Sequence, residues 1–291
     1  MFAITGITGK VGGALARDLL ADKRNVRAVL RDAAKATEWQ VQGCEVAVAD
    51  MDDTASLATA FKNTAGVFIL PPSEFDPKPG FPEARRVIDA VRAALVEARP
   101  GKVVCLSTIG ADAPYENLLT QRTLMEQALS DIGLPITFLR PAWFMENAAW
   151  DVAAARDEGV LRTFLQPADK QVPMVATKDV GSAAATLLLE DWNGTRVVEL
   201  EGPARISPNN LAQAFATVLG RAIRAEIVPR ETWEPLFRAQ GTNNPLPRIR
   251  MLDGFNESWI EFQNQGRSTM KGTTPLETVI AHLVEADQAS A

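Results

Sequence analysis

Residues 2–13 of the chain read FAITGITGKVGG, and this segment decides the fold. A short apolar run comes first and is followed by a cluster of glycines. Apolar residues then recur at helical spacing between Ala14 and Leu20. This order predicts a β-strand, a glycine turn and an α-helix at the start of the chain.

The glycines stand at positions 6, 9 and 12, a G-x-x-G-x-x-G variant of the dinucleotide-binding fingerprint. Gly6 permits a tight exit from the strand, Gly9 lets the backbone approach a pyrophosphate, and Gly12 lets the helix pack closely. The N–H groups at the helix N-terminus then face the phosphates. A turn that binds nothing is the alternative, but the flanking strand and helix favour a nucleotide. The expected contact residues are Gly6, Thr8, Gly9, Lys10, Val11 and Gly12.

Length and composition indicate a large globular chain. The 291 residues are 46% hydrophobic, and 30 basic against 36 acidic residues give a net charge of −6, which disfavours nucleic acid as a partner. Because no apolar run of about 18 residues occurs and the first strand begins at Met1, we expect no membrane span, no signal peptide and a cytoplasmic protein. Cys44 and Cys105 are isolated and His282 is the only histidine, so we expect reduced thiols and no metal site.

Strand-like and helical segments alternate along the first half of the chain. Further strands are expected at 25–30, 45–49, 66–70, 103–107 and 136–139. The alternation predicts an α/β fold with a doubly wound parallel sheet of the Rossmann type.

The chain is expected to have two domains. Residues 1–147 form the NAD(P)-binding domain, and 177–201 return to it, with 197–201 as its last strand. Residues 148–176 and 202–291 form a smaller α+β substrate or lid domain. Within it we expect a hairpin tip at 167–171 and a helix over 249–263.

In this fold, the residues at the end of the second strand determine whether the site prefers NAD or NADP. An NAD site places a carboxylate there, whereas the 2′-phosphate of NADP needs a cation. Arg31 therefore indicates NADP, with Lys35 in support, and Asp32 leaves NAD open. Since ligands bind at the carboxyl ends of parallel strands, further cofactor contacts are expected there. We place Asp50 and Met51 beside the adenine, and the next strand ends at Leu70, Pro71 and Pro72.

Four motifs carry a resemblance to a known family: TGITGKVG at 5–12, VLRD at 29–32, LSTIGAD at 106–112 and LRPAWFMEN at 139–147. In order and spacing they resemble the NmrA-like family of atypical short-chain dehydrogenases/reductases, and within it the NAD(P)H:quinone oxidoreductase type. The resemblance implies an NADP(H) site made by 6–12, Arg31, the turn at 70–74 and 141–147, including Pro141, Phe144 and Asn147. It also implies that the nicotinamide lies near Thr108, Trp143 and Phe144.

The chain departs from the usual short-chain dehydrogenase at the proton-transfer residues. Tyr115 is the only tyrosine and position 119 is leucine, so the Tyr-x-x-x-Lys pair is missing. Quinone reduction depends less on this pair, because water can supply the proton that follows hydride transfer. Positioning of the two reactants then supplies much of the catalysis. Trp143, Phe144 and Trp150 are candidates for an aromatic slot, with Asn147 as a hydrogen-bonding residue. Ordinary core packing is the alternative for these aromatic residues.

Arg122 stands four residues before Glu126, where many NmrA-like proteins place a lysine or histidine. An arginine binds a ribose or carbonyl oxygen, but it stays protonated and is a poor acid or base. The alternative is an i,i+4 ion pair between Arg122 and Glu126 on a solvated helix face. The expected catalytic residues are thus Arg122, Thr108 and Trp143.

Two functions remain open. The first is an NADPH-dependent reductase of a quinone-like or small carbonyl compound, with hydride delivered in an aromatic pocket. The second is a non-catalytic NADP(H) sensor whose domains open or close and present a surface to a protein partner. A homodimer is also open. The missing tyrosine and lysine favour the sensor, whereas the aromatic segment at 143–150 favours the enzyme, which we prefer.

Overall fold

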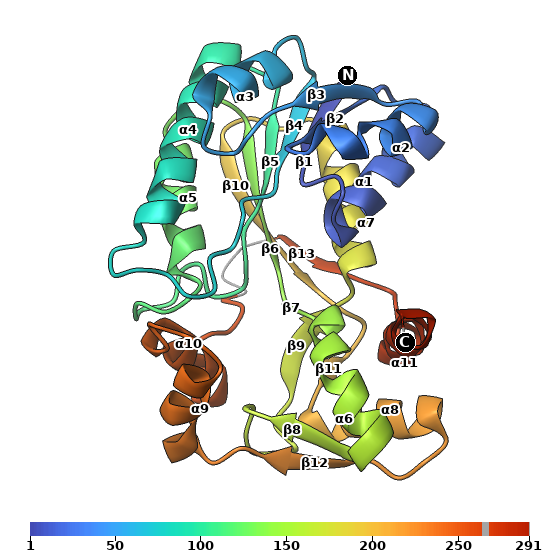
Figure 1. Cartoon of the computed structure of the whole chain (residues 1–291). Helices are drawn as coiled ribbons and strands as arrows, with labels where there is room; N and C mark the ends of the chain where they lie inside the picture. Colours follow the sequence, from blue (N-terminus) through green and yellow to red (C-terminus); the bar gives the residue numbers. More distant parts are fainter. Residues whose placement is uncertain (264–267, 291) are drawn as a thin grey trace.

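The structure is a computed structural model that describes residues 1–263 and 268–290. An eight-stranded sheet forms its larger part, in the order β13-β10-β6-β5-β4-β1-β2-β3 (Figure 1). All neighbouring strands in this sheet run parallel. The strands are β1 (Phe2–Thr5), β2 (Val26–Leu30), β3 (Glu45–Val48), β4 (Gly66–Ile69), β5 (Val103–Leu106), β6 (Ile136–Pro141), β10 (Thr195–Glu201) and β13 (Ser268–Lys271).

Helices cover both faces of the sheet, as buried parallel strands require. One face carries α1 (Lys10–Ala21) and α7 (Thr177–Leu189), with α2 (Ala36–Val41) near β2 and β3. The other carries α3 (Thr54–Phe61), α4 (Pro82–Ala98) and α5 (Thr120–Leu129) (Figure 1). The contact between α1 and α7 is very close, because a Cβ atom at Gly181 would lie 2.6 Å from that of Ala14.

The predicted Rossmann-type sheet is confirmed, with the predicted strand runs differing from the observed ones by one or two residues at their ends. The strand order reverses between β1 and β4, which in doubly wound sheets is where ligands bind. Thr5 ties these two strand ends together. Its hydroxyl donates to the Phe68 carbonyl at 3.1 Å and accepts from the Leu70 N–H at 2.8 Å. The switch point therefore has a fixed geometry.

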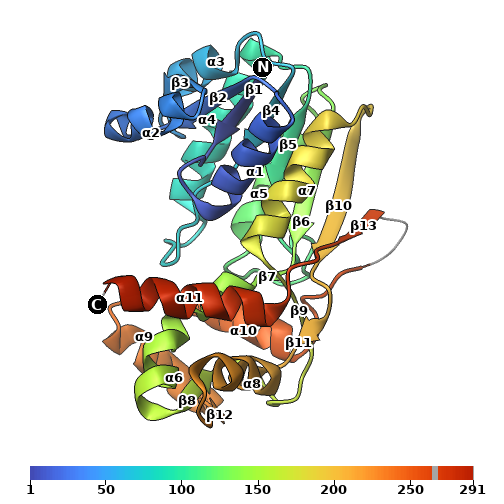
Figure 2. The same ribbon diagram turned by 90° about the vertical axis from the view of Figure 1, so that its right-hand side faces the viewer.

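The remaining elements form a smaller layer beyond the carboxyl ends of the strands (Figures 1 and 2). It holds a three-stranded sheet, β11-β9-β7, and the parallel pair β12-β8. In Figure 2, α11 crosses between the large sheet and α8, on which it packs. The bounds are β7 (Trp143–Phe144), α6 (Val152–Glu158), β8 (Val160–Thr163), β9 (Val172–Val175), β11 (Arg205–Ile206), α8 (Pro208–Leu219), β12 (Arg224–Ile227), α9 (Trp233–Ala239), α10 (Leu246–Asn256) and α11 (Leu276–Ser290), with 3₁₀ helices at Met145–Asp151 and Arg230–Thr232. A further 3₁₀ helix, Ala33–Lys35, lies in the large domain between β2 and α2.

Two local predictions were wrong. Residues 167–171 are not a hairpin tip, because β8 pairs with β12 whereas β9 pairs with β7 and β11. The helix predicted over 249–263 ends at Asn256, where Ser258 takes a left-handed φ of 66° and the Ile260 N–H returns to the Gly254 carbonyl at 3.0 Å. Within the described ranges, no helix is both long and apolar enough to cross a membrane.

Candidate active site

The glycine loop joins β1 to α1 at the switch point. Gly6 has a φ of 63°, a conformation that side-chain-bearing residues rarely adopt. A Cβ atom at Gly12 would lie only 2.4 Å from the Gly6 carbonyl oxygen, so only glycine fits there without moving the loop. The close approach of the helix expected at Gly12 is thus a contact with the loop backbone of Gly6 and Ile7.

The loop leaves its outer side open to a ligand. Thr8, Gly9 and Lys10 are exposed, and Gly9 stands at the N-cap of α1 without a side chain to cap it. The Gly13 N–H makes the first helical bond, to the Gly9 carbonyl at 2.9 Å. The N–H groups before it lie in the first turn, where helices leave donors without intrahelical acceptors. This arrangement fits a pyrophosphate.

The residues after β2 include an exposed cation, Arg31, that a ligand phosphate can reach. Arg31 is exposed and makes no ion pair or hydrogen bond through its side chain with any described residue. The Asp32 carboxylate already has a local partner, because it accepts a hydrogen bond from the Ala34 N–H at 2.9 Å and caps a 3₁₀ turn. Asp50 is exposed after β3, while Met51 is half-buried against the α3–α4 side of the core.

Arg122 holds the loop that follows β4. Its guanidinium donates to the carbonyls of Pro71 at 2.9 Å and Pro72 at 3.2 Å, and to the Ser73 hydroxyl at 2.7 Å. The alternative of an Arg122–Glu126 ion pair on a solvated face is therefore wrong. Burial lowers the pKa of Arg122 to about 10, which still leaves the side chain charged at neutral pH. The structure thus brings Arg122 to the predicted cofactor segment at 70–72.

Glu126 belongs to a separate buried network beneath the site. It accepts two hydrogen bonds from Arg140, at 2.9 and 2.7 Å, and one from the Ser107 hydroxyl. Arg140 also pairs with Asp112 at 2.7 Å, and these carboxylates raise the pKa of its guanidinium. Ser107 follows β5 and Arg140 lies in β6, so the network joins two adjacent strand ends to α5. Sequence reasoning missed it, although an arginine within the apolar run of β6 was a signal.

The far end of the same loop is fastened to the smaller layer. Asp76 accepts from the Asn243 N–H at 2.9 Å, from the Asn243 side chain at 2.8 Å and from the Asn244 N–H at 2.7 Å. These bonds lower the pKa of the Asp76 carboxyl, with the backbone donors as the largest cause. The Asn244 side chain also donates to the Pro77 carbonyl at 2.7 Å. No sequence pattern had indicated this connection, which we call the Asp76 clasp.

The predicted nicotinamide end lies where β5 and β6 finish. Thr108 is half-buried, and its hydroxyl makes no hydrogen bond with the described residues. Trp143 pairs with Met174 of β9 and packs edge-on against Phe255 of α10, with ring centroids 5.0 Å apart. Phe144 is half-buried beside it. Thr108 follows β5, whereas Trp143 and Phe144 follow β6 and form β7 of the three-stranded sheet.

The segment after β6 also fixes the start of α7. Pro141 is buried at the end of β6, and Asn147 is half-buried without a side-chain hydrogen bond to the described residues. Glu146 accepts from the Thr177 N–H through both carboxylate oxygens, each at 2.9 Å, and so caps α7. The side chain of Trp150 is 74% exposed, so the alternative of ordinary core packing is wrong for this residue.

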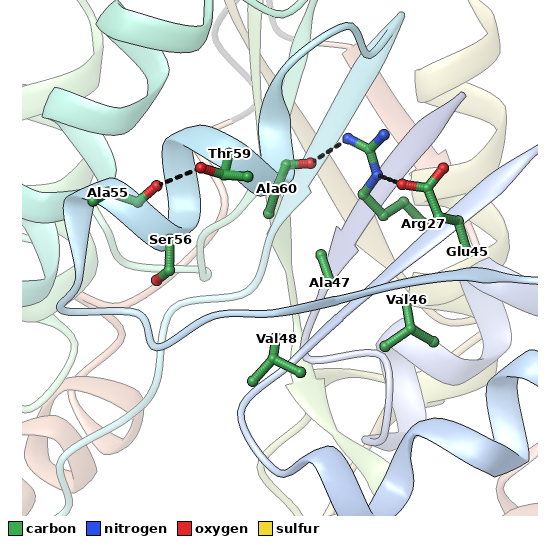
Figure 3. Close-up of a pocket in the computed structure, with 9 residues that line it drawn as sticks. All are labelled: Arg27, Glu45, Val46, Ala47, Val48, Ala55, Ser56, Thr59 and Ala60. Atoms are coloured by element: carbon green, nitrogen blue, oxygen red, sulfur yellow. Dashed lines mark hydrogen bonds and ion pairs between the residues drawn. The ribbon is translucent and has the colours of Figure 1, made fainter.

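A hollow of about 620 Å³ lies elsewhere, between β3 and α3 (Figure 3). Its polar groups satisfy one another: Arg27 pairs with Glu45 at 2.6 Å and donates to the Ala60 carbonyl at 2.8 Å. None of the predicted site residues lines it. In the described part of the chain, no group of three or more His, Cys, Asp or Glu side chains could hold a metal ion.

The parallel sheet, its switch point and the glycine cradle define a Rossmann-type α/β protein. The chain belongs to the NmrA-like family, whose sequence profile matches residues 1–264. It is 29% identical over 249 residues to quinone oxidoreductase 2 of Escherichia coli, covering 84% of both chains. It is also 32% identical over 228 residues to a (4-alkanoyl-5-oxo-2,5-dihydrofuran-3-yl)methyl phosphate reductase of Streptomyces griseus, covering 78% of this chain and 76% of the relative.

Solved structures show the same fold. The NADPH-dependent quinone oxidoreductase of Escherichia coli in complex with NADPH superposes with a TM-score of 0.81 at 23% identity, over 97% of this chain and 99% of that one. The triphenylmethane reductase of a Citrobacter species in complex with NADP(H) superposes with a TM-score of 0.78 at 21% identity, over 97% of this chain and 99% of that one.

Proposed function

We propose that the protein is an NADPH-dependent oxidoreductase that reduces a quinone or a small carbonyl compound. One observation supports the proposal most. The glycine loop after β1, Thr108 after β5 and Trp143 after β6 all lie at the carboxyl ends of strands of the large sheet. The named relatives support the reaction class, since they include a quinone oxidoreductase, an NAD(P)H azoreductase and a (4-alkanoyl-5-oxo-2,5-dihydrofuran-3-yl)methyl phosphate reductase.

The cofactor-binding roles follow from the open groups of the site. Residues 8–12 surround the pyrophosphate and bind it through backbone N–H groups other than that of Gly9, which donates to the Gly6 carbonyl at 3.0 Å. The exposed guanidinium of Arg31 binds the 2′-phosphate of NADP. Asp32 is used in a local cap, which disfavours NAD. Leu70, Pro71 and Pro72 flank the dinucleotide in the position that Arg122 fixes. Pro141, Phe144 and Asn147 carry its nicotinamide end.

The chemistry requires little from the side chains. The nicotinamide supplies a hydride, and a quinone that accepts it needs one further proton, from water, to become a hydroquinone. Thr108 has a hydroxyl without a partner among the described residues, so it donates a hydrogen bond to the acceptor oxygen. Trp143 and Phe144 orient the acceptor ring and exclude water. Arg122 is a positioning residue, because the three hydrogen bonds of its guanidinium all go to the loop after β4.

The domain predicted at 148–176 and 202–291 is proposed to close over the acceptor, although its β13 joins the large sheet and β7 lies outside its bounds. The Asp76 clasp supports this, since it joins the loop after β4 to the α9–α10 connection. We also propose a cytoplasmic location, where the buried thiols of Cys44 and Cys105 stay reduced.

The test is a fluorescence titration with NADPH and NADH, followed by addition of 1,4-naphthoquinone. The wild type is expected to prefer NADPH, and Arg31→Ala to lose that preference. Arg24→Ala is the matched control, since Arg24 is exposed before β2 whereas Arg31 is exposed after it. NADPH binding without quinone-dependent oxidation would support the sensor instead, and binding of neither nucleotide would overturn both functions.

A further inference from the structure

Arg248 is a half-buried cation on α10 that has no acidic partner among residues 1–263 and 268–290. Its guanidinium lies over the ring of Phe237, 4.2 Å from the centroid, and 5.8 Å from that of Phe164. Burial lowers the pKa of this arginine, and no carboxylate opposes the effect. The side chain is therefore held in place by aromatic rings, while its N–H donors make no hydrogen bond with the described residues.

This state is unusual within the molecule. The described arginines that are buried or half-buried are Arg27, Arg92, Arg122, Arg140, Arg156, Arg196 and Arg248. All except Arg248 have an ion pair or a side-chain hydrogen bond with described residues. A partly desolvated guanidinium is costly without hydrogen-bond acceptors, so such groups normally have a partner. The missing partner points to a ligand.

The position of Arg248 connects it with the candidate active site. Phe255 lies seven residues further along α10, hence on the same face and roughly 10 Å away along the helix axis. Phe255 packs against Trp143, the residue proposed to orient the acceptor. Trp143 also packs against the small core of α9 and α10, to which Phe237 belongs. One helix face therefore leads from the acceptor-binding aromatic residues to an unpaired cation.

We propose that Arg248 binds an acidic group of the acceptor, so that the natural substrate is a quinone or carbonyl compound bearing a phosphate, sulfonate or carboxylate. An oxyanion supplies the two acceptor oxygens that a guanidinium binds in a bidentate manner. The reducible ring then lies toward Trp143. This inference rests on the proposed function, because it concerns the acceptor of the same reaction.

The test compares 1,4-naphthoquinone with 1,4-naphthoquinone-2-sulfonate. The quantity measured is the ratio of kcat/KM for the sulfonate to kcat/KM for the parent compound, which cancels general effects on the enzyme. Arg248→Met keeps an apolar stem over Phe237 but removes the charge, and Arg248→Lys keeps the charge. Arg250→Met is the control, since Arg250 is exposed on the same helix and, within the described part of the chain, its side chain donates only to the Glu116 carbonyl. Thermal melting establishes that each variant is folded.

We expect the ratio to fall about tenfold or more in Arg248→Met, to be partly retained in Arg248→Lys, and to match the wild type in Arg250→Met. An unchanged ratio in Arg248→Met overturns the proposal. A parallel loss of activity toward both acceptors also overturns it, because Arg248 then only supports the aromatic core.

Equilibrium binding separates this proposal from the proposed function. If the wild type oxidises no NADPH with either acceptor, the proposed reaction fails. Equilibrium binding of the two compounds, measured by quenching of tryptophan fluorescence, then tests the oxyanion site at Arg248 independently of the reaction. Tighter binding of the sulfonate that is lost in Arg248→Met supports an oxyanion site, and equal binding of the two compounds overturns it.

Discussion

Arg122 and Glu126 lie one turn apart on α5 but do not pair with each other. Arg122 donates to the backbone of the loop after β4, and Glu126 binds Arg140 of β6. One helix thus fixes two elements at the carboxyl edge of the sheet, the loop that flanks the proposed cofactor and the strand that leads to Trp143. This division of roles explains why an arginine serves at position 122, since a single side chain supplies donors to three oxygens.

Replacing Arg122 by methionine should loosen residues 71–73 and weaken NADPH binding by about tenfold, because three hydrogen bonds from a charged group are lost. Arg122→Lys should restore little, since an ammonium group cannot reproduce the fork of donors. Hydrogen exchange at the amides of Ser73 and Glu74, which follow the two prolines, and the Kd for NADPH measure the two effects. Unchanged exchange in Arg122→Met would contradict the positioning role.

Glu126→Gln should lower the free energy of unfolding by about 2 kcal/mol, because the charge-assisted hydrogen bonds of Glu126 are weakened and Asp112 alone then compensates the charge of Arg140. The Arg140 side chain is 6% exposed and that of Glu126 12% exposed, so water cannot replace the lost interaction. Urea unfolding measures the change. Glu97→Gln, at an exposed position of α4, should stay within about 0.5 kcal/mol of the wild type. Equal stabilities of the two variants would contradict the account of the network.

The Asp76 clasp should depend on pH in a defined direction. The pKa of Asp76 is lowered in the folded protein, so its stabilising contribution is present above the ordinary carboxyl pKa and is lost as pH falls through the lowered value. At neutral pH, Asp76→Asn should therefore increase hydrogen exchange at 241–244 relative to the wild type. At a pH below the lowered pKa, the two proteins should exchange alike. A difference that is independent of pH would show that the carboxylate charge does not hold the clasp.

The sequence predicted the large sheet well because its signals are local. The glycine spacing at 6, 9 and 12 and the apolar strands identify each βα unit without knowledge of distant contacts. β13 was not predicted, since its sequence STMK is polar and it joins the sheet only by pairing with β10. The supposed hairpin at 167–171 failed for a related reason. Which strands pair in the smaller layer depends on residues far along the chain, such as 224–227 for β8.

The candidate site could be predicted only as a set of strand ends. The positions of the motifs predict that Gly12, Thr108 and Trp143 lie near one another, because the carboxyl ends of parallel strands lie on the same side of a sheet. The hydrogen-bond partners of individual side chains could not be predicted in this way, as Arg122 and Glu126 show. Their helical spacing favours an ion pair, but a carbonyl-rich loop on one side and Arg140 on the other offer better partners in the folded protein.

The most direct test of the proposed reaction is the initial rate of NADPH consumption with 1,4-naphthoquinone, measured for the wild type and Gly12→Ala. A Cβ atom at position 12 would lie 2.4 Å from the Gly6 carbonyl oxygen, so the alanine variant should lose the cradle. We predict quinone-dependent NADPH oxidation by the wild type, a much slower reaction with NADH, and almost none in a folded Gly12→Ala variant. NADPH that binds the wild type but is not oxidised, or a Gly12→Ala variant as active as the wild type, would contradict the account.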